Sequence, residues 1–331
     1  MPTLSSLLCE AGRLAGEVHK KYLQRGFQVE KKSELESDVV TVADKESEQV
    51  LRNFFAQHLP DYNIFGEEFG ASYNGNGKVI VIDPLDGTLS FTKKLDGFGT
   101  VIAVYDEQKK SLSLNEIQSK KFGWSPEAFI YLTPPALLIG GATLERKIQS
   151  GRKIESGGKT ESKKVQCVAG YVSNTLKGIS YFGTREEGFH RHGLEEIIPK
   201  RAIFLGGAFS RDEQVAGIMK QLLQEEFPDH PLVMHTQQVT NRCRVYEGNW
   251  AVSLHGALAW HDIAPDPLFG QLTGCKVTDL QGNSYEHFDF QKELENYQSE
   301  DRSRVYSKPI LVCQPKYFDG MMRVMEKFRK G

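Results

Sequence analysis

The hydrophobic and polar positions in the first third of the chain predict two helices and a set of strands. Apolar residues recur at helical spacing over residues 4–22 and again over residues 50–55, which indicates helices that bury one face. The unbroken apolar run at residues 79–82 predicts a strand that is covered on both faces, and residues 100–105 predict another strand. We therefore expect an N-terminal α+β part with a mostly antiparallel sheet between helices.

The last third of the chain alternates strand and helix patterns. A strand-like run at residues 202–205 precedes a helical pattern at residues 215–223, an order that favours a layered α/β domain. Between the two parts, residues 107–164 are rich in lysine, glycine and serine, and we place the domain boundary there. We expect one domain over residues 1–150 and a second over residues 151–331.

Composition and charge narrow the class of protein. Apolar residues make up 39% of the chain, charged residues 25%, and the net charge is −2, so the balance gives no general attraction to nucleic acid polymers or anionic lipid. No apolar run approaches the roughly 20 residues of a membrane-spanning helix, and the N-terminus lacks the layout of a secretory signal. Five widely spaced cysteines indicate free thiols, and we expect a cytoplasmic protein.

The segment VIVIDPLDGT, residues 79–88, joins a buried strand to a cluster of reactive side chains. Pro84 has no N–H for a strand ladder, so we expect the strand to end at Asp83 and the chain to turn. The turn would place Asp83 and Asp86 on one rim, with the free amides of Gly87 and Thr88 beside them. Two close carboxylates require a cation, and a metal beside an anion-binding turn indicates a phosphate-containing substrate.

Other acidic residues fit either a structural role or the same site. Asp44 could pair with Thr41 in a helix-capping arrangement. Glu67 and Glu68 lie between glycines and aromatic residues and could form a solvated turn. Asp262 could cap a helix, or could arrive from the second domain as a third carboxylate. In the second case the active site would lie between the domains.

Three motifs occur in a fixed order: GEE at residues 66–68, DPLDGT at 83–88 and DIAP at 262–265. Together they resemble the inositol monophosphatase superfamily, which includes inositol monophosphatases, 3′(2′),5′-bisphosphate nucleotidases, histidinol-phosphate phosphatases and fructose-1,6-bisphosphatases. The likeness covers most of residues 1–105 and about 200–285. It implies a two-part α+β and α/β layered sandwich, with layers in the order αβαβα.

The resemblance implies a magnesium site with two or three ions. Glu67, Asp83 and the backbone carbonyl of Leu85 correspond to ligands of one ion. Asp83, Asp86 and Asp262 correspond to ligands of a second. Such coordination suits Mg²⁺, which keeps several waters and meets the substrate through phosphate oxygens.

The resemblance also implies catalytic roles. Glu67 and Thr88 correspond to the pair that orients and deprotonates the attacking water, and Asp44 corresponds to the residue that supports Thr88. The amides of Gly87 and Thr88 would bind the phosphate, and Glu68 would lie behind the ligands. Hydrolysis would then depend on positioning and charge neutralisation, without a covalent intermediate.

The implied activity is that of a lithium-sensitive, magnesium-dependent phosphomonoesterase acting on a small phosphorylated polyol such as an inositol phosphate. The segment LDGFGT at residues 95–100 is similar to the histidinol-phosphate branch, whereas DIAP is similar to the bisphosphate nucleotidases, so both remain alternatives. The expected partner is the small phosphorylated substrate. Relatives in the superfamily are often dimers, so a homodimer is possible.

One departure and two rival classes bear on this hypothesis. The superfamily usually has tryptophan directly before the last aspartate, whereas here His261 precedes Asp262 and Trp260 lies one residue earlier. Haloacid-dehalogenase phosphatases have one residue between their two aspartates, while two residues separate Asp83 from Asp86, which favours metal ligation over an aspartyl-phosphate. The second rival is a binding protein that keeps the fold without catalysis.

Overall fold

The computed structural model describes residues 2–31, 39–71, 74, 76–106, 165–194, 199–234, 239–285, 293, 295 and 308–330. The expected boundary segment, residues 107–164, lies outside the described residues. No helix within the described ranges combines the length and apolar character needed to cross a membrane. All five cysteines are free, as predicted.

Seven strands form the larger sheet, in the spatial order β4-β3-β5-β6-β7-β8-β9. The strands are β3 (Asn63–Gly66), β4 (Gly70–Ala71), β5 (Val79–Asp86), β6 (Gly99–Asp106), β7 (Gln166–Asn174), β8 (Ile179–Thr184) and β9 (Gly188–His192). β3 and β5 are parallel, and the other neighbours are antiparallel. The expectation of a mostly antiparallel N-terminal sheet is confirmed.

The second sheet has five strands in the order β11-β10-β12-β14-β13. They are β10 (Ile203–Gly206), β11 (Leu232–Met234), β12 (Val252–Leu258), β13 (Lys276–Thr278) and β14 (Lys308–Cys313). β10 is parallel to both of its neighbours, whereas β14 is antiparallel to β12 and β13. A separate pair consists of β1 (Val29–Lys31) and β2 (Val39–Thr41).

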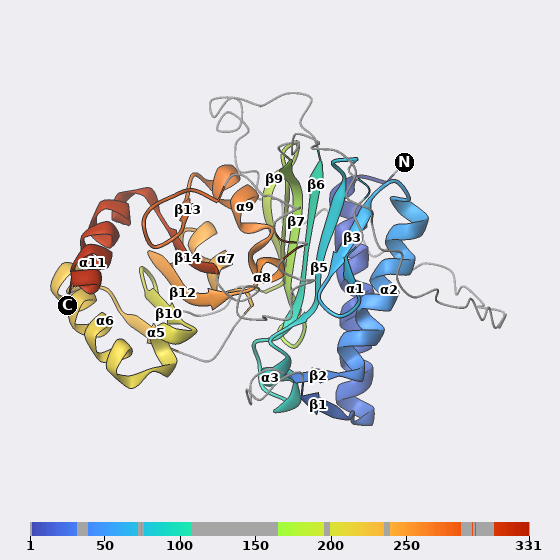
Figure 1. Cartoon of the computed structure of the whole chain (residues 1–331), viewed down its shortest axis with the longest axis horizontal. Helices are drawn as coiled ribbons and strands as arrows, with labels where there is room; N and C mark the ends of the chain where they lie inside the picture. The colour runs from blue at the N-terminus through green and yellow to red at the C-terminus, as the bar shows by residue number, and fades with distance from the viewer. Residues whose placement is uncertain are drawn as a thin grey trace.

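The helices lie outside and between these sheets. They are α1 (Leu4–Arg25), α2 (Val42–His58), α3 (Thr88–Thr92), α5 (Ala208–Arg211), α6 (Glu213–Glu226), α7 (Asn241–Tyr246), α8 (Trp260–Ile263), α9 (Asp266–Thr273) and α11 (Phe318–Lys330), with a 3-10 turn η2 (Pro315–Tyr317). Figure 1 shows α1 and α2 outside the larger sheet, α7, α8 and α9 between the sheets, and α6 and α11 outside the smaller sheet. The predicted αβαβα layered fold is confirmed.

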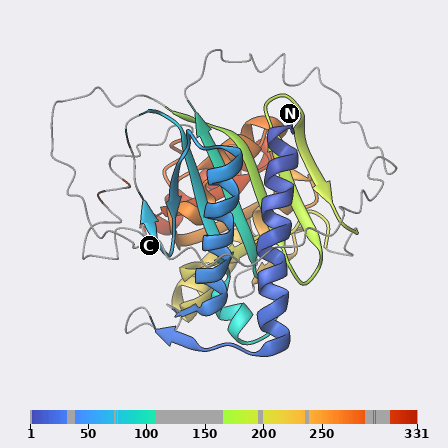
Figure 2. The same ribbon diagram turned by 90° about the vertical axis from the view of Figure 1, so that its right-hand side faces the viewer.

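The alternation of side chains along β5 connects two of these layers. Ile80 and Ile82 pack with α1 and α2, which lie side by side over the sheet in Figure 2. Val79 and Val81 point to the other face and join the core between the two sheets. Because every residue of β5 is buried, the apolar run is explained by burial on both faces, as expected.

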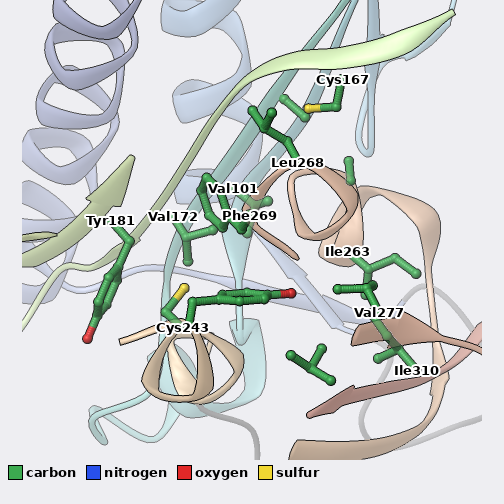
Figure 3. Packing of buried hydrophobic residues seen from close by; sticks show 14 of the residues in the cluster. Val101, Cys167, Val172, Tyr181, Cys243, Ile263, Leu268, Phe269, Val277 and Ile310 are labelled. Carbon is green, nitrogen blue, oxygen red and sulfur yellow. The ribbon is translucent and has the colours of Figure 1, made fainter. Parts of the chain in front are cut away.

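The core between the sheets joins the two parts of the chain. Figure 3 shows Val101 and Val172 of the larger sheet packed near Phe269 of α9, with Val277 and Ile310 of the smaller sheet on the far side of that helix. These residues belong to one continuous buried apolar cluster. The position of α8 and α9 relative to β5 is therefore fixed by apolar packing.

The change from one sheet to the other does not occur near residue 150. β7, β8 and β9 belong to the expected C-terminal domain, yet they extend the larger sheet through pairing of β7 with β6. The chain changes sheet between β9 and β10. The division of the chain between the two sheets therefore differs from the expected division into two domains at residue 150.

Candidate active site

The end of β5 departs from the expected sharp stop at Asp83. The strand continues to Asp86, but its register against β6 shifts between Asp83 and Asp86, so Pro84 lies at an irregularity where no N–H is needed. The Asp83 carboxylate accepts a hydrogen bond from the Leu85 amide at 3.0 Å. This irregularity brings Asp83 and Asp86 together beside the turn that begins α3.

Two groups of candidate metal ligands meet at this point. One contains Glu67, Asp83 and His261, and the other contains Asp83, Asp86 and Asp262. In each group the ligand atoms lie within 4.8 Å of one another. Asp83 belongs to both groups, so one carboxylate can contribute to two adjacent cation positions.

The loop that carries Glu67 is bound by the buried carboxylate of Glu48, whose role was not predicted from the sequence. Glu48 of α2 accepts hydrogen bonds from the Glu68 amide at 2.7 Å and the Phe69 amide at 3.2 Å. A Cβ atom at Gly66 would lie 2.1 Å from a Glu48 oxygen, so glycine is needed for this contact. Glu68 belongs to neither candidate ligand group, consistent with the expected position behind the ligands.

Asp262 reaches the site from α8 in the second part of the chain. Its Oδ2 accepts a hydrogen bond from the Ala259 amide at 3.0 Å, while its backbone carbonyl accepts one from Arg242. Arg242 is itself buried and donates to Asp266 at 2.9 Å. The Asp262 side chain therefore caps α8 from within its first turn and also joins the carboxylate cluster, so the two alternatives are compatible.

Thr88 and Asp44 form a hydrogen-bonded pair. Thr88 Oγ1 donates to Asp44 Oδ1 at 2.9 Å and lies 3.0 Å from the carbonyl oxygen of Leu85. The other oxygen of Asp44 accepts from the Thr41 amide at 2.8 Å and from the Thr41 hydroxyl at 2.6 Å. Asp44 thus has the capping role and also holds Thr88.

Gly87 has the backbone conformation that the turn requires. Its φ of 84° is unfavourable for other residues, and an added Cβ would lie 2.4 Å from the Gly97 carbonyl oxygen. Gly87 ends the irregular part of β5 and begins α3. The glycine in the DPLDGT motif is thereby explained by backbone geometry.

The carboxylates are buried close together, which shifts their protonation. Burial and the neighbouring charges of Glu67 and Asp86 raise the pKa of Asp83 well above its ordinary value. Burial and the charge of Asp262 raise the pKa of Asp86 to about 7, and burial raises the pKa of Asp44 to about 6. Burial opposes ionisation of Asp262 as well, but the neighbouring His261 and a hydrogen bond with Asp83 outweigh it and lower its pKa.

The donor set fits a divalent cation. Several buried carboxylates with raised pKa values repel one another, and a bound cation would relieve that repulsion. Glu67, Asp83, Asp86 and Asp262 offer the hard oxygen ligands that suit Mg²⁺. The carbonyl oxygen of Leu85, another expected ligand, lies 3.0 Å from the Thr88 hydroxyl oxygen.

His19 contacts the backbone of the turn at Pro84. Its role was not predicted from the sequence. It is fully buried, with Nε2 2.9 Å from the Pro84 carbonyl oxygen and Nδ1 2.9 Å from Thr175 Oγ1. Burial lowers its pKa to about 4, so the imidazole is neutral near pH 7. As a neutral donor to Pro84, it stabilises the irregular end of β5.

The first third of the chain is similar in sequence to known proteins. Residues 2–114 match the model of the inositol monophosphatase family. A histidinol-phosphatase from Chlorobaculum parvum is 35% identical over 109 residues, which is 33% of this chain and 41% of that protein. The chain thus matches less than half the length of this curated relative.

Two solved structures share the fold over nearly the whole chain. The suhB extragenic suppressor protein from Bartonella henselae is 15% identical, with a TM-score of 0.62 over 97% of this chain and 98% of that one. An IMPase/NADP phosphatase complexed with Mg²⁺ and phosphate is also 15% identical, with a TM-score of 0.60 over 96% of this chain and 93% of that one. The first third of the chain, residues 2–114, thus matches the inositol monophosphatase family, and the fold of nearly the whole chain is similar to that of these two proteins.

Proposed function

We propose that the protein is a magnesium-dependent phosphomonoesterase that hydrolyses a small phosphorylated polyol such as an inositol monophosphate. The observation that carries this proposal is the meeting of Glu67, Asp83, Asp86 and Asp262 beside the hydrogen-bonded pair Thr88 and Asp44. The family match and the Mg²⁺ and phosphate bound in a protein of the same fold support it.

The carboxylates would hold the cations and leave the substrate phosphate to complete their coordination. Bound there, Mg²⁺ would neutralise phosphate charge and lower the pKa of a nearby water. We propose two or three ions, of which two would occupy the two ligand groups that share Asp83. The amides of Gly87 and Thr88, at the start of α3, would bind phosphate oxygens in the same proposal.

The protein side chains would orient the attacking water and receive its proton. Because the Thr88 hydroxyl donates to Asp44, its oxygen lone pairs remain able to accept a hydrogen bond from water. Glu67 belongs to the ligand cluster and would act as a general base. With a pKa of about 6, Asp44 can share the released proton through Thr88 near neutral pH.

Histidinol phosphate is a second candidate substrate. It is favoured by the 35% identity to a histidinol-phosphatase over 109 residues, and by the LDGFGT segment. In this segment Asp96 accepts from Asn174 at 2.7 Å and pairs with Lys177 at 2.6 Å, so its charge is already engaged by the protein. The candidate metal ligands do not include Asp96 and would serve either substrate, so the substrate panel decides between the two.

Phosphate release from a substrate panel tests the proposal. The panel contains inositol monophosphate, histidinol phosphate, fructose 1,6-bisphosphate and adenosine 3′,5′-bisphosphate, each with Mg²⁺, with chelator, and with Mg²⁺ plus lithium. We expect release that needs Mg²⁺ and is inhibited by lithium, with the best substrate defining the branch. A folded protein that binds Mg²⁺ but releases no phosphate from any member would favour the non-catalytic rival.

A further inference from the structure

We propose that His261 is a direct metal ligand and that the position it forms with Glu67 and Asp83 selects a transition-metal ion, such as Mn²⁺ or Zn²⁺, over Mg²⁺. This inference rests on the proposed metal-dependent function and concerns the identity of the ion at one position. The other position, formed by Asp83, Asp86 and Asp262, has oxygen ligands alone. The protein would then hold two cation positions of different chemical preference.

The imidazole is aimed into the carboxylate cluster. His261 Nε2 lies 3.2 Å from Asp262 Oδ1, 3.6 Å from Glu67 Oε2 and 4.0 Å from Asp83 Oδ2. Atoms bonded to one cation at about 2.0–2.2 Å lie roughly 3–4 Å from one another. The contacts with Glu67 and Asp83 are too long for hydrogen bonds, but they have the spacing of donors around a shared ion.

The burial of His261 supports the same interpretation. Its side chain is 2% exposed, and it lies in the first turn of α8 next to Asp262. Trp260 faces the core instead, with its ring 6.0 Å from that of Tyr105. In the order Trp260-His261-Asp262, the tryptophan therefore packs α8 against the core, and the histidine places a ring nitrogen near the carboxylates.

Ligand chemistry then predicts the preferred ion. Mg²⁺ favours oxygen ligands and retains its waters, whereas an imidazole nitrogen suits transition-metal ions, Zn²⁺ more strongly than Mn²⁺. Among the residues that the structure describes, His261 is the one histidine that groups with these candidate carboxylates. A single side chain therefore accounts for the predicted difference between the two positions.

Pulsed electron paramagnetic resonance of the Mn²⁺-loaded protein tests the nitrogen ligand without requiring turnover. We expect a directly coordinated ¹⁴N signal from the wild type, which changes to the ¹⁵N pattern when histidine is labelled with ¹⁵N. His261→Gln should remove this signal and weaken Mn²⁺ or Zn²⁺ binding by at least about tenfold while changing Mg²⁺ binding much less. His190→Gln, on β9 and outside both ligand groups, should retain the signal.

The outcomes separate this inference from the proposed function. Absence of a histidine nitrogen signal in Mn²⁺-loaded wild type, or equal affinities for Mg²⁺ and Mn²⁺, would overturn the inference even if the protein is an active phosphatase. A nitrogen signal that depends on His261 would support it even if no phosphate is released. If His261→Gln does not fold, the isotope-labelled wild type still decides between nitrogen and oxygen ligation.

Discussion

The hydroxyl of Thr88 donates a hydrogen bond of 2.9 Å to Asp44, a residue that lies 44 positions earlier in the chain. Asp44 also forms the capping box at the start of α2 through Thr41. The same carboxylate therefore fixes a helix terminus and the direction of a hydroxyl beside the proposed metal site. This dual role makes Thr88 the more informative position to substitute, because its loss leaves the helix cap intact.

Removing the Thr88 hydroxyl should reduce turnover more than stability. We expect Thr88→Ala to lower kcat by about 10²- to 10⁴-fold, since the residue would no longer orient the attacking water. Thr88→Ser keeps the hydroxyl and should retain most of the activity. Steady-state kinetics on the best panel substrate measures both variants, and an equal loss in the two would contradict the role of the hydroxyl.

The contact of Gly66 with Glu48 should be sensitive to a single methyl group. Gly66→Ala would place a carbon 2.1 Å from the Glu48 carboxylate, so either the loop or the helix must move. We expect a loss of about 1–3 kcal/mol in the free energy of unfolding and a lower metal affinity, because Glu67 is carried by that loop.

Gly217 provides the matched control for this substitution. It lies in α6, and an added Cβ would meet nothing within 4 Å. Gly217→Ala should leave metal binding unchanged and raise the free energy of unfolding by about 0.5–1 kcal/mol, because alanine favours a helix. Urea unfolding of both variants gives the comparison. A neutral Gly66→Ala would show that Glu48 does not fix the loop.

His19 should make stability depend on pH on the acidic side. Its pKa falls from an ordinary 6.5 to about 4 in the folded protein. The unfolded chain therefore binds the proton first as the pH falls from about 6.5 to 4, and the folded state loses up to about 3 kcal/mol over that range. The difference between wild type and His19→Gln in urea unfolding at several pH values isolates this contribution. Parallel curves for the two proteins would contradict it.

In the metal-free protein, the carboxylate cluster should lower stability as the pH rises, which is the opposite of the effect of His19. The pKa values of Asp83 and Asp86 are raised, so between about pH 4 and 7 the unfolded chain releases protons first and the metal-free fold loses stability as the pH rises. Bound cations offset this loss, with about 2.7 kcal/mol of stabilisation at 100 times Kd.

Thermal unfolding with and without divalent cation measures this effect. The increase in Tm on adding cation should be larger at pH 8 than at pH 5, because protons compete with the cation at the lower pH. Asp83→Asn should reduce the difference in Tm between protein with cation and protein without it. A cation effect that does not change with pH would argue against a site built from these carboxylates.

The strands could be predicted from the sequence, and so could the candidate metal ligands that lie in short motifs. The apolar run of β5 and the DPLDGT turn could be interpreted locally, because the strand, the proline and the glycine each have a local physical signature. The hydrogen bond between Thr88 and Asp44 was expected from the family resemblance, because both residues lie in short motifs that carry it.

Residues whose roles depend on distant contacts could not be predicted in this way. Glu48 resembles any acidic residue on a helix until Gly66 is placed beside it. His19 meets Pro84 across 65 residues, and Arg242 meets Asp266 across 24. The arrangement of the two sheets decides these contacts, and no local pattern in the sequence reports it.

Phosphate release by wild type, Asp83→Asn and Asp61→Asn is the most direct test of the central claim that this carboxylate cluster is a metal-dependent phosphatase site. Asp83 belongs to both ligand groups, whereas the side chain of Asp61 is 80% exposed and belongs to neither. We predict that Asp83→Asn loses at least about 10³-fold in cation-dependent kcat/KM and that Asp61→Asn keeps the wild-type value. Comparable cation-dependent activity in all three proteins would contradict the account.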